Sequence, residues 1–379
     1  MDEWKRHQRI FYLIDSALSG SICRKFNMTH EDLHVDGPIL LVPNHASAWD
    51  PLLVAASLRD KQVYYVSSEH LFRLGFVSRV IDYLFAPIPR RKASTGMDTV
   101  KACLRHLKAG HSVCLFAEGE QCWAGQNNPI FPATGKLVKS SGATLVTYRL
   151  EGAYLSLPRW GKGIRRGRVH GHPVGIYPPE QLQAMTPQQI NDLITRDIRE
   201  DAWERQRKDP VPYRGKNRAE GMERALFLCP RCRRIGTLQT RGNRLFCSCG
   251  LDLEYQETGF FLPDRPFSEI AEWDVWQKDA LCRGDFTWEN PAGLLFSDSG
   301  VSLFRLEAEH REELLGSGVL QQYENRLECA GFRFPMKDIS GMADVLAGRL
   351  LLSANGEYYE IRSKKGICFR KYLEFWRKK

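Results

Sequence analysis

The chain has 379 residues, whereas single domains cluster at roughly 100 to 150 residues, so we expect two or three domains. Its composition, with 43% apolar and 26% charged residues, is that of a globular protein and argues against a disordered or membrane-embedded chain. No stretch reaches the roughly 20 apolar residues of a membrane-spanning helix, and the first residues lack the pattern of a secretory signal. We therefore expect a cytoplasmic protein whose 11 cysteines are thiols or metal ligands.

The formal net charge of +9 is concentrated in one part of the chain. A run of cations between residues 149 and 168 is opposed by Glu151 alone, which predicts a local surface that attracts anions. Phosphorylated substrates, acidic lipid headgroups and nucleic acid would all be attracted, so charge does not choose among them. The cations are Arg149, Arg159, Lys162, Arg165, Arg166 and Arg168.

The first predicted element is an amphipathic helix, with apolar residues at helical spacing and basic residues around them. Its apolar stripe either packs on the protein's own core or docks at a membrane surface, and the sequence leaves both open. The stripe comprises Trp4, Phe11, Ile14, Leu18 and Ile22, with His7 as a borderline member.

From residue 37 to about residue 175, short apolar runs alternate with helical stretches. Residues 51–58 and 98–108 are predicted helices, and Thr186 with Pro187 marks the start of a helix that closes the first domain. Strands separated by helices predict an α/β fold with a mostly parallel central sheet. The predicted strands are residues 39–42, 63–66, 113–116 and 144–148.

A histidine and an aspartate follow the first of these strands, in the sequence Asn-His-Ala-Ser-Ala-Trp-Asp that ends at residue 50. A neutral imidazole at His45 can accept the proton of an attacking hydroxyl, and a carboxylate at Asp50 can fix its tautomer. Residues at this spacing do not share a helix face, so the pairing requires a turn between them. The alternative is that Asp50, before Pro51, is an ordinary helix cap and that His45 makes only local hydrogen bonds.

The pair His45 and Asp50, with its preceding asparagine, resembles the first motif of the lysophosphatidic acid and glycerol-phosphate acyltransferases, the PlsC-like family. Three further segments resemble the other motifs of this family, in the same order. The resemblance covers roughly residues 1–205 and implies an acyltransferase domain there. The segments are residues 87–90, residues 116–119, and residues 145–148 followed by Gly152.

The resemblance implies transfer of a fatty acyl group from acyl-CoA or acyl carrier protein to the hydroxyl of a lysophospholipid, in phospholipid biosynthesis at the inner face of a membrane. His45 would be the general base, oriented by Asp50, and no catalytic metal would be needed. Arg90 would hold the acceptor's phosphate, with Arg91 as an adjacent alternative, because a guanidinium presents donors suited to phosphate oxygens. The residues expected to line the acceptor pocket are Glu118 and Gly119.

The third motif departs from the family pattern, which usually continues with threonine, arginine and serine. This chain has Glu120, Gln121 and Cys122 there, so a second phosphate-binding cation is missing. Either the cations of residues 149–168 substitute for it, or the acceptor's headgroup differs from that of lysophosphatidic acid. Cys122 is an alternative nucleophile, although the His45 and Asp50 pair explains transfer without it.

Two cysteine pairs predict a structural zinc site in a zinc ribbon. Each pair forms a knuckle, and a predicted hairpin that turns at residues 241–243 lies between them. Four thiolates fill a tetrahedral zinc site and leave no open position, so the metal should support folding rather than catalysis. Arginines decorate the ribbon, but few aromatic residues lie among them, so we do not expect nucleic acid as a partner. The ligands are Cys229, Cys232, Cys247 and Cys249.

The chain after the ribbon reads as a β-rich domain with a closing helix at residues 370–377, and it resembles a small barrel of the pleckstrin-homology (PH) or GRAM kind. Its predicted strands are residues 294–297, 301–306, 332–335, 350–353 and 358–361. The expected organisation is an acyltransferase domain at 1–205, a polar linker at 206–225, the zinc ribbon at 226–254 and the β-rich domain at 255–379.

Two rival functions belong to other classes. One is a nucleic-acid-binding protein that uses the zinc ribbon, and the other is a catalytically silent module that binds lipid. Binding to RNA that weakens linearly with the logarithm of salt concentration would indicate the first. Lipid binding without turnover would indicate the second.

Overall fold

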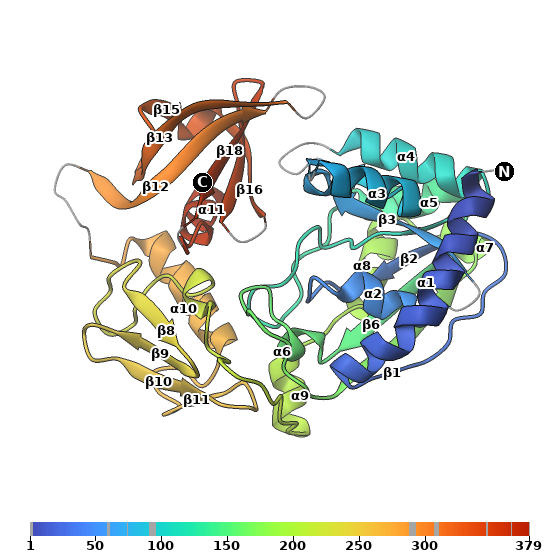
Figure 1. Cartoon of the computed structure of the whole chain (residues 1–379), viewed down its shortest axis with the longest axis horizontal. Coiled ribbons are helices and arrows are strands. Elements are labelled where there is room, and N and C mark those ends of the chain that lie inside the picture. The colour runs from blue at the N-terminus through green and yellow to red at the C-terminus, as the bar shows by residue number, and fades with distance from the viewer. Residues whose placement is uncertain are drawn as a thin grey trace.

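A computed structural model describes residues 3–58, 61–73, 75–90, 96–287, 293–306, 311–345, 348–364 and 366–378. An α/β domain, which we call the N-terminal domain, occupies one side of the molecule (Figure 1). A small β-sheet module and a β-rich C-terminal domain lie together on its other side (Figure 1). No helix in these ranges is both long and apolar enough to cross a membrane.

The N-terminal domain is built on a seven-stranded sheet of order β1-β7-β6-β2-β5-β3-β4. All neighbouring strands pair in parallel except β6 and β7, so the predicted α/β fold with a mostly parallel sheet is confirmed. The central strand β2 is buried along its whole length, as expected for an apolar run covered on both faces. The strands are β1 (Met28–His30), β2 (Ile39–Pro43), β3 (Val63–Ser68), β4 (Ile88–Arg90), β5 (Ser112–Cys114), β6 (Thr144–Glu151) and β7 (Val169–Tyr177).

Helices cover both faces of this sheet (Figure 1). The α-helices are α1 (Glu3–Phe26), α2 (Asp50–Ala55), α3 (Phe76–Phe85), α4 (Met97–Lys108), α5 (Thr134–Ser141), α6 (Ala153–Ser156), α7 (Pro179–Ala184), α8 (Pro187–Asp197) and α9 (Ala202–Lys208), with a 3-10 helix η1 (Glu69–Arg73) before α3. Helix α8 begins where the sequence predicts, because Thr186 and Gln189 form a reciprocal capping box.

The first helix packs its apolar stripe mainly on the domain's core. Phe11 and Ile22 are buried, as are His7 and Phe26. Leu13 lies on the opposite side with 71% of its surface exposed. Phe11 and Ile22 of the stripe therefore pack on the core, whereas Leu18 of the same stripe is 49% exposed.

The segment predicted as a polar linker, residues 206–225, is packed rather than extended. Tyr213 and Met222 are buried, and the Tyr213 hydroxyl donates to the carbonyl oxygen of Arg168 over 2.7 Å. A 3-10 helix, η2 (Met222–Arg224), ends the segment. The few apolar side chains of residues 206–225 fill the junction between the N-terminal domain and the module. The average polarity of the segment does not reveal this packing.

The small module contains the predicted hairpin and extends beyond it. Strands β8 and β9 turn at Gly242, whose φ of 60° favours glycine, and two more strands extend the antiparallel sheet. A long helix, α10, follows the sheet. The elements are β8 (Leu238–Arg241), β9 (Arg244–Cys247), β10 (Asp252–Tyr255), β11 (Phe261–Leu262) and α10 (Ile270–Arg283).

The C-terminal domain is a seven-stranded antiparallel meander of order β15-β14-β13-β12-β18-β17-β16. The first strand in chain order, β12, pairs with the last, β18, and helix α11 follows. This arrangement agrees with the barrel that the sequence suggested. The two strands predicted at residues 294–306 form one long strand. The elements are β12 (Leu294–Leu306), β13 (Glu312–Tyr323), β14 (Arg326–Cys329), β15 (Phe332–Pro335), η4 (Met336–Asp338), β16 (Ile339–Val345), β17 (Arg349–Ala354), β18 (Glu357–Ser363) and α11 (Arg370–Arg377).

The module joins the two larger parts through shared apolar cores. One core contains Trp203 of the N-terminal domain together with Tyr255 and Trp273 of the module. Another fills the C-terminal domain and includes Phe227 and Ile235 of the module. The module therefore fixes the C-terminal domain relative to the N-terminal domain.

Candidate active site

His45 and Asp50 meet at the carboxyl end of strand β2. The His45 Nδ1 atom lies 2.9 Å from Asp50 Oδ2, so the predicted turn between them brings the two side chains together. Since a carboxylate accepts hydrogen bonds, this contact places the proton on Nδ1 and leaves Nε2 as the basic nitrogen. In the described part of the chain, no hydrogen-bond partner occupies Nε2.

Asp50 is fully buried and also organises the turn. Its Oδ2 atom accepts hydrogen bonds from the backbone amides of Ala46, at 2.6 Å, and Ser47, at 2.9 Å. Asp50 therefore holds the peptide that carries His45 as well as the imidazole itself. Asp50 is not a helix cap, because α2 begins at Asp50 itself and no described side chain caps its first turn.

Asn44 anchors this turn to the neighbouring strand. Its Oδ1 atom accepts from the amide of Leu150 at 2.7 Å, and its Nδ2 atom donates to the Leu150 carbonyl at 3.0 Å. These paired hydrogen bonds join the start of the motif to β6. Asn44 is therefore a positioning residue for His45.

Glu118 lies behind His45, and its carboxylate is not among the described groups that line the pocket. It accepts hydrogen bonds from the His45 amide at 2.8 Å, from Asn127 Nδ2 at 2.9 Å and from the Asn128 amide at 2.6 Å. Burial raises the pKa of Glu118 to about 7, although these donors act in the opposite direction. The geometry gives Glu118 a positioning role, where the resemblance implied a pocket-lining one.

Sequence reasoning did not identify Asn127 and Asn128 as partners of this site. The sequence does show two adjacent polar residues after the third motif. It does not show that they lie within hydrogen-bond distance of Glu118 in the folded chain. Asn127 also accepts from the Glu200 amide at 2.6 Å, which connects the motif loop to the segment before α9.

His45 lines a pocket with a volume of about 440 Å³, within the range typical of small-molecule sites. The imidazole stacks on Phe116, with ring centroids 4.3 Å apart, and its side chain remains 16% exposed. Gly119 lines the same pocket with a φ of 72°, and a Cβ atom there would come within 2.2 Å of Phe131. Only glycine fits this position without a shift of the ring.

Arg90 also lines the pocket, from strand β4. Its guanidinium stacks on Phe131 at 4.4 Å, and no carboxylate pairs with it in the described ranges. Burial lowers the pKa of Arg90, because removing water from the guanidinium disfavours its charged form. Arg91, the adjacent alternative, lies outside the described residues.

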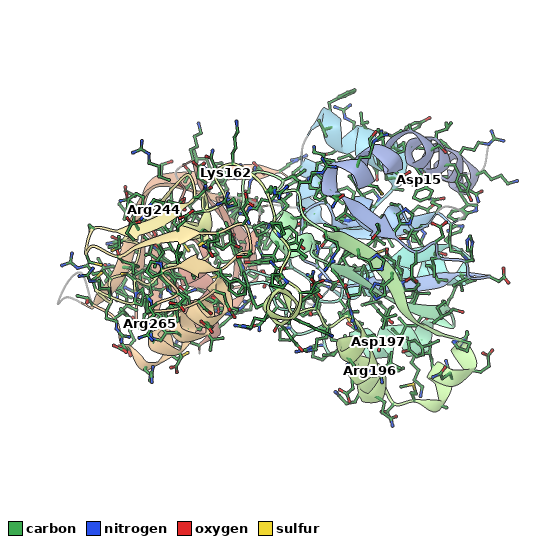
Figure 2. All side chains as sticks on the ribbon, turned by 90° about the horizontal axis from the view of Figure 1, so that it is seen from below. Asp15, Lys162, Arg196, Asp197, Arg244 and Arg265 are labelled. Atoms are coloured by element: carbon green, nitrogen blue, oxygen red, sulfur yellow. The ribbon has the colours of Figure 1, made fainter. Side chains whose placement is uncertain are left out.

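The six cations of residues 149–168 do not form one anion-binding surface. Arg165 is buried and donates to the Arg218 carbonyl at 2.5 Å, while Arg149 donates to the Asp197 carbonyl at 2.6 Å. Lys162 lies at the outer surface (Figure 2). Arg159 lines the pocket, but its charge is paired with Glu120 at 2.8 Å. These cations mostly serve the fold, because carbonyl and carboxylate oxygens surround them.

Cys122 is buried beneath the site and does not line the pocket in the described structure. Its backbone amide donates to the His45 carbonyl at 2.9 Å. Burial raises the pKa of the Cys122 thiol well above its ordinary value, which disfavours the reactive thiolate. The structure therefore gives no support to Cys122 as a nucleophile.

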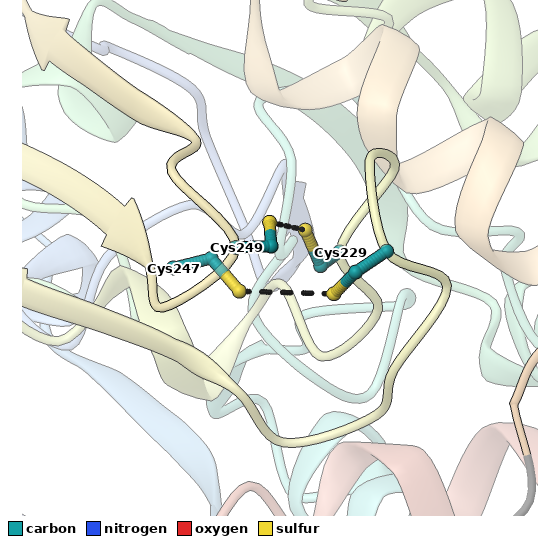
Figure 3. Close-up of side chains that lie close together, drawn as sticks. Cys229, Cys247 and Cys249 are labelled. Carbon is teal, nitrogen blue, oxygen red and sulfur yellow. Dashed lines mark hydrogen bonds between the residues drawn. The ribbon is translucent and has the colours of Figure 1, made fainter.

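The four cysteines of the module converge on one point (Figure 3). Cys229 Sγ lies 3.6 Å from Cys249 Sγ, and Cys232 Sγ lies 3.8 Å from Cys247 Sγ. Four sulfurs about 2.3 Å from a tetrahedral zinc ion would be about 3.8 Å apart, whereas a disulfide requires about 2.05 Å. The cysteines therefore fit a structural metal site and are too far apart for disulfides.

Part of the N-terminal domain matches a known protein family. Residues 25–151 match the family model described as Acyltransferase. Among solved structures, the chain is similar to the 1-acyl-sn-glycerophosphate (LPA) acyltransferase PlsC from Thermotoga maritima, with 16% identity and a TM-score of 0.42. That match covers 52% of this chain and 82% of the other. The N-terminal domain therefore contains a segment similar to the Acyltransferase family.

Proposed function

We propose that this protein transfers a fatty acyl group from acyl-CoA or acyl carrier protein to the hydroxyl of a lysophospholipid resembling lysophosphatidic acid. The observation that carries the proposal is the hydrogen bond from His45 Nδ1 to Asp50 at the edge of a pocket. This arrangement leaves Nε2 able to take a proton from a hydroxyl in that pocket. It also favours catalysis over a silent lipid-binding role, which would not need an oriented base.

The proposed reaction has two steps. His45 Nε2 takes the proton from the acceptor hydroxyl while that oxygen attacks the thioester carbonyl carbon, which forms a tetrahedral oxyanion. Collapse of this intermediate breaks the carbon–sulfur bond, and the thiolate takes the proton back from His45. The products are the new ester and the free thiol, and the buried Asp50 carboxylate stabilises the imidazolium between the steps.

The phosphate of the acceptor would bind at Arg90. A half-buried guanidinium without a carboxylate partner in the described residues gains from a phosphate, because the anion offsets the cost of desolvation. Gly96, at the start of α4, lies so close that a Cβ atom would be 2.6 Å from Arg90 Nη1. A helix N-terminus also favours an anion, so the Arg90 guanidinium and the start of α4 would both attract the phosphate.

The acceptor is expected to come from a membrane surface at which the protein associates peripherally. Helix α3 exposes apolar side chains, with Phe76 at 74%, Tyr83 at 57% and Val77 at 51% exposure, and it also carries the exposed Arg79. It connects η1, which contributes Leu71 to the pocket, to β4, which contributes Arg90. Docking of α3 at the inner face of a membrane would place lipid beside the pocket.

The ribbon arginines give little support to the nucleic-acid alternative. Arg244 pairs with Asp252 at 2.7 Å, and Arg233 pairs with Asp285 at 2.8 Å. These cations are therefore partly neutralised within the module. A zinc ribbon that bound nucleic acid would be expected to keep them available for phosphates.

Mass spectrometry of lipids tests the proposed function and identifies the acceptor. Lipids would be compared between cells with the intact protein, cells without it and cells with the His45→Ala variant. We expect loss of a diacylated phospholipid and accumulation of its single-chain precursor in both deficient strains. An unchanged lipid profile, together with no turnover of any lysophospholipid by purified protein, would contradict the proposal.

A further inference from the structure

The pocket that contains His45 and Arg90 is closed by residues from the second half of the chain. The N-terminal domain supplies His45, Arg90 and Phe116, among others. The opposite wall is formed by Arg224, Asp344, Val345, Gly348, Ile367 and Phe369. The site is therefore composite, and its second wall lies outside the segment that matches the acyltransferase family.

We propose that this second wall selects the acceptor. In this proposal, which rests on the proposed function, Arg224 supplies a second cation for the acceptor's anionic headgroup. Val345, Ile367 and Phe369 form an apolar wall that limits the size of that headgroup. The ligand class is a single-chain lipid with a small, phosphorylated headgroup.

Arg224 has the environment expected of an anion-binding residue. Its guanidinium donates to the carbonyl oxygens of Trp160 and Gly221, and no carboxylate lies within ion-pair distance among the described residues. Burial lowers the pKa of Arg224, although Glu223 and Asp344 are near enough to act in the opposite direction. A phosphate in the pocket would supply the missing close partner.

The charges lining the pocket also favour an anion. Arg90, Arg159 and Arg224 line it together with two carboxylates, Glu120 and Asp344, so the cations exceed the anions by one. Glu120 is already paired with Arg159, which reduces its repulsion of a bound phosphate. The Asp344 backbone carbonyl accepts a hydrogen bond from Arg159 at 2.5 Å, which ties this wall to the N-terminal domain.

Glu120 explains why the third motif departs from the family pattern. It binds Arg159 at 2.8 Å and Arg377 of helix α11 at 2.7 Å. A second bridge joins Arg73 of η1 to the buried Glu360 of β18 at 3.1 Å. Glu120, at the position where the family usually carries threonine, is thus used here to fasten the C-terminal domain over the pocket. The usual phosphate-binding arginine is replaced by the adjacent Gln121, and Arg224 supplies the lost charge.

The cation is tested with purified full-length protein and two acceptors that differ in the phosphate, lysophosphatidic acid and the monoacylglycerol with the same chain. We expect Arg224→Ala to raise the KM for lysophosphatidic acid about 10- to 100-fold, the range of a charge-assisted hydrogen bond, and to change the KM for monoacylglycerol little. Arg224→Lys should restore part of the loss, because it keeps the charge. Arg283→Ala is the matched control, since Arg283 pairs with Asp279 on an exposed helix surface at 2.6 Å.

The apolar wall is tested with two variants in the same core. Ile367→Ala enlarges the pocket, whereas Ile361→Ala removes the same atoms from the same apolar cluster away from the pocket. We expect Ile367→Ala to raise turnover of lysophospholipids with larger headgroups relative to lysophosphatidic acid, and Ile361→Ala to leave that ratio unchanged. Both variants should lose a similar amount of stability, which separates selectivity from folding.

The outcomes distinguish this inference from the proposed function. If the wild type turns over lysophospholipids but Arg224→Ala weakens both acceptors equally, or Ile367→Ala behaves like Ile361→Ala, the selecting wall is wrong and the acyltransferase remains. If the wild type turns over no acceptor at all, the proposed function fails first.

Discussion

At the scale of single residues, Asp50 shows how the structure decides between two interpretations of one sequence pattern. Its Oδ2 atom accepts from His45 Nδ1 and from the amides of Ala46 and Ser47. The sequence could suggest both roles because aspartate before proline caps helices and also orients histidines. It could not decide between them, because the contact with His45 depends on how the turn closes; in the structure Asp50 orients His45 and does not cap α2.

Glu118 shows the limit of reasoning by motif. The resemblance implied a pocket-lining residue, whereas the carboxylate holds the His45 amide and the loop of Asn127 and Asn128. The spacing of a motif places such a residue near the site but does not determine which way its side chain points. The Glu118 side chain is oriented by hydrogen-bond donors from the loop of Asn127 and Asn128. The sequence does not specify the path of this loop.

The raised pKa of Glu118 predicts a pH dependence of stability. The pKa rises from 4.5 to about 7 on folding, so the folded state binds this proton more tightly than the unfolded state. This contribution to stability is therefore complete below about pH 4.5 and is lost as the pH rises through about 7, by up to about 3 kcal/mol. Chemical denaturation of the wild type and Glu118→Gln at pH 5 and pH 8 measures it.

We expect the wild type to lose stability relative to Glu118→Gln between these two pH values, because glutamine does not titrate. Comparing the change with pH, rather than the absolute stabilities, removes the cost of altered hydrogen bonds in the variant. An equal difference at both pH values would show that folding does not raise the pKa of Glu118.

At the scale of elements, helices and strands were predicted correctly where the local sequence carried both their apolar pattern and their end signals. Helix α8 carries its own capping box, and β2 is an apolar run of the length of a buried strand. Helix α10 was missed because it buries polar residues such as Asp274 and Gln277. Arg370, the partner of Asp274, lies 96 residues away, with its Nη2 atom 2.8 Å from Asp274, so no local pattern marked the helix as amphipathic.

Strand β13 was missed for a different reason. Gly316 and Gly318 interrupt it, and glycines at that spacing suggest turns. A Cβ atom at Gly316 would lie 3.3 Å from the Ala330 Cβ, so glycine there allows close approach of a neighbouring segment. The need for glycine at this position arises from tertiary packing, which the sequence does not show.

The cysteine module gives a prediction at this scale. Purified protein should contain about one zinc ion per chain, and Cys229→Ser or Cys249→Ser should release it. Because structural zinc contributes on the order of 10 kcal/mol to folding of small modules, each variant should unfold the module. Metal analysis with limited proteolysis measures both effects, and Cys282→Ser, at an exposed cysteine outside the cluster, is the control. Protein that lacks metal yet resists cleavage in the module would contradict the metal assignment.

At the scale of the whole molecule, the pocket depends on contacts between distant parts of the chain. Arg73 and Glu360 are 287 residues apart, and Arg377 and Glu120 are 257 apart. The sequence predicted an N-terminal domain, a ribbon and a β-rich domain, but it did not indicate that the β-rich domain would close the pocket. Such contacts follow from how the module packs on both neighbours, and no motif records this.

The exposed face of α3 gives a prediction about membrane association. Replacing Phe76 and Val77 with aspartate should reduce sedimentation with anionic vesicles, because it places charges on an apolar surface and loses its burial in lipid. Folding should persist, since both side chains are exposed, whereas the buried Phe11 of α1 could not be changed without cost to the core. Val275→Asp, at an exposed valine on α10, is the control. Unchanged vesicle binding would place the membrane contact on another surface.

The His45 and Asp50 pair is the central claim, and acyl transfer by its variants tests it most directly. His45→Ala should lower kcat about 10²- to 10⁴-fold while fold and lipid binding remain nearly intact, because the side chain supplies a base rather than core packing. Asp50→Asn should be similarly impaired, and the double variant should be little worse than either single one, since the two residues act as a unit. A steady-state assay of thiol release with lysophosphatidic acid measures all three variants. Near-normal turnover by His45→Ala with several acceptors would contradict the account.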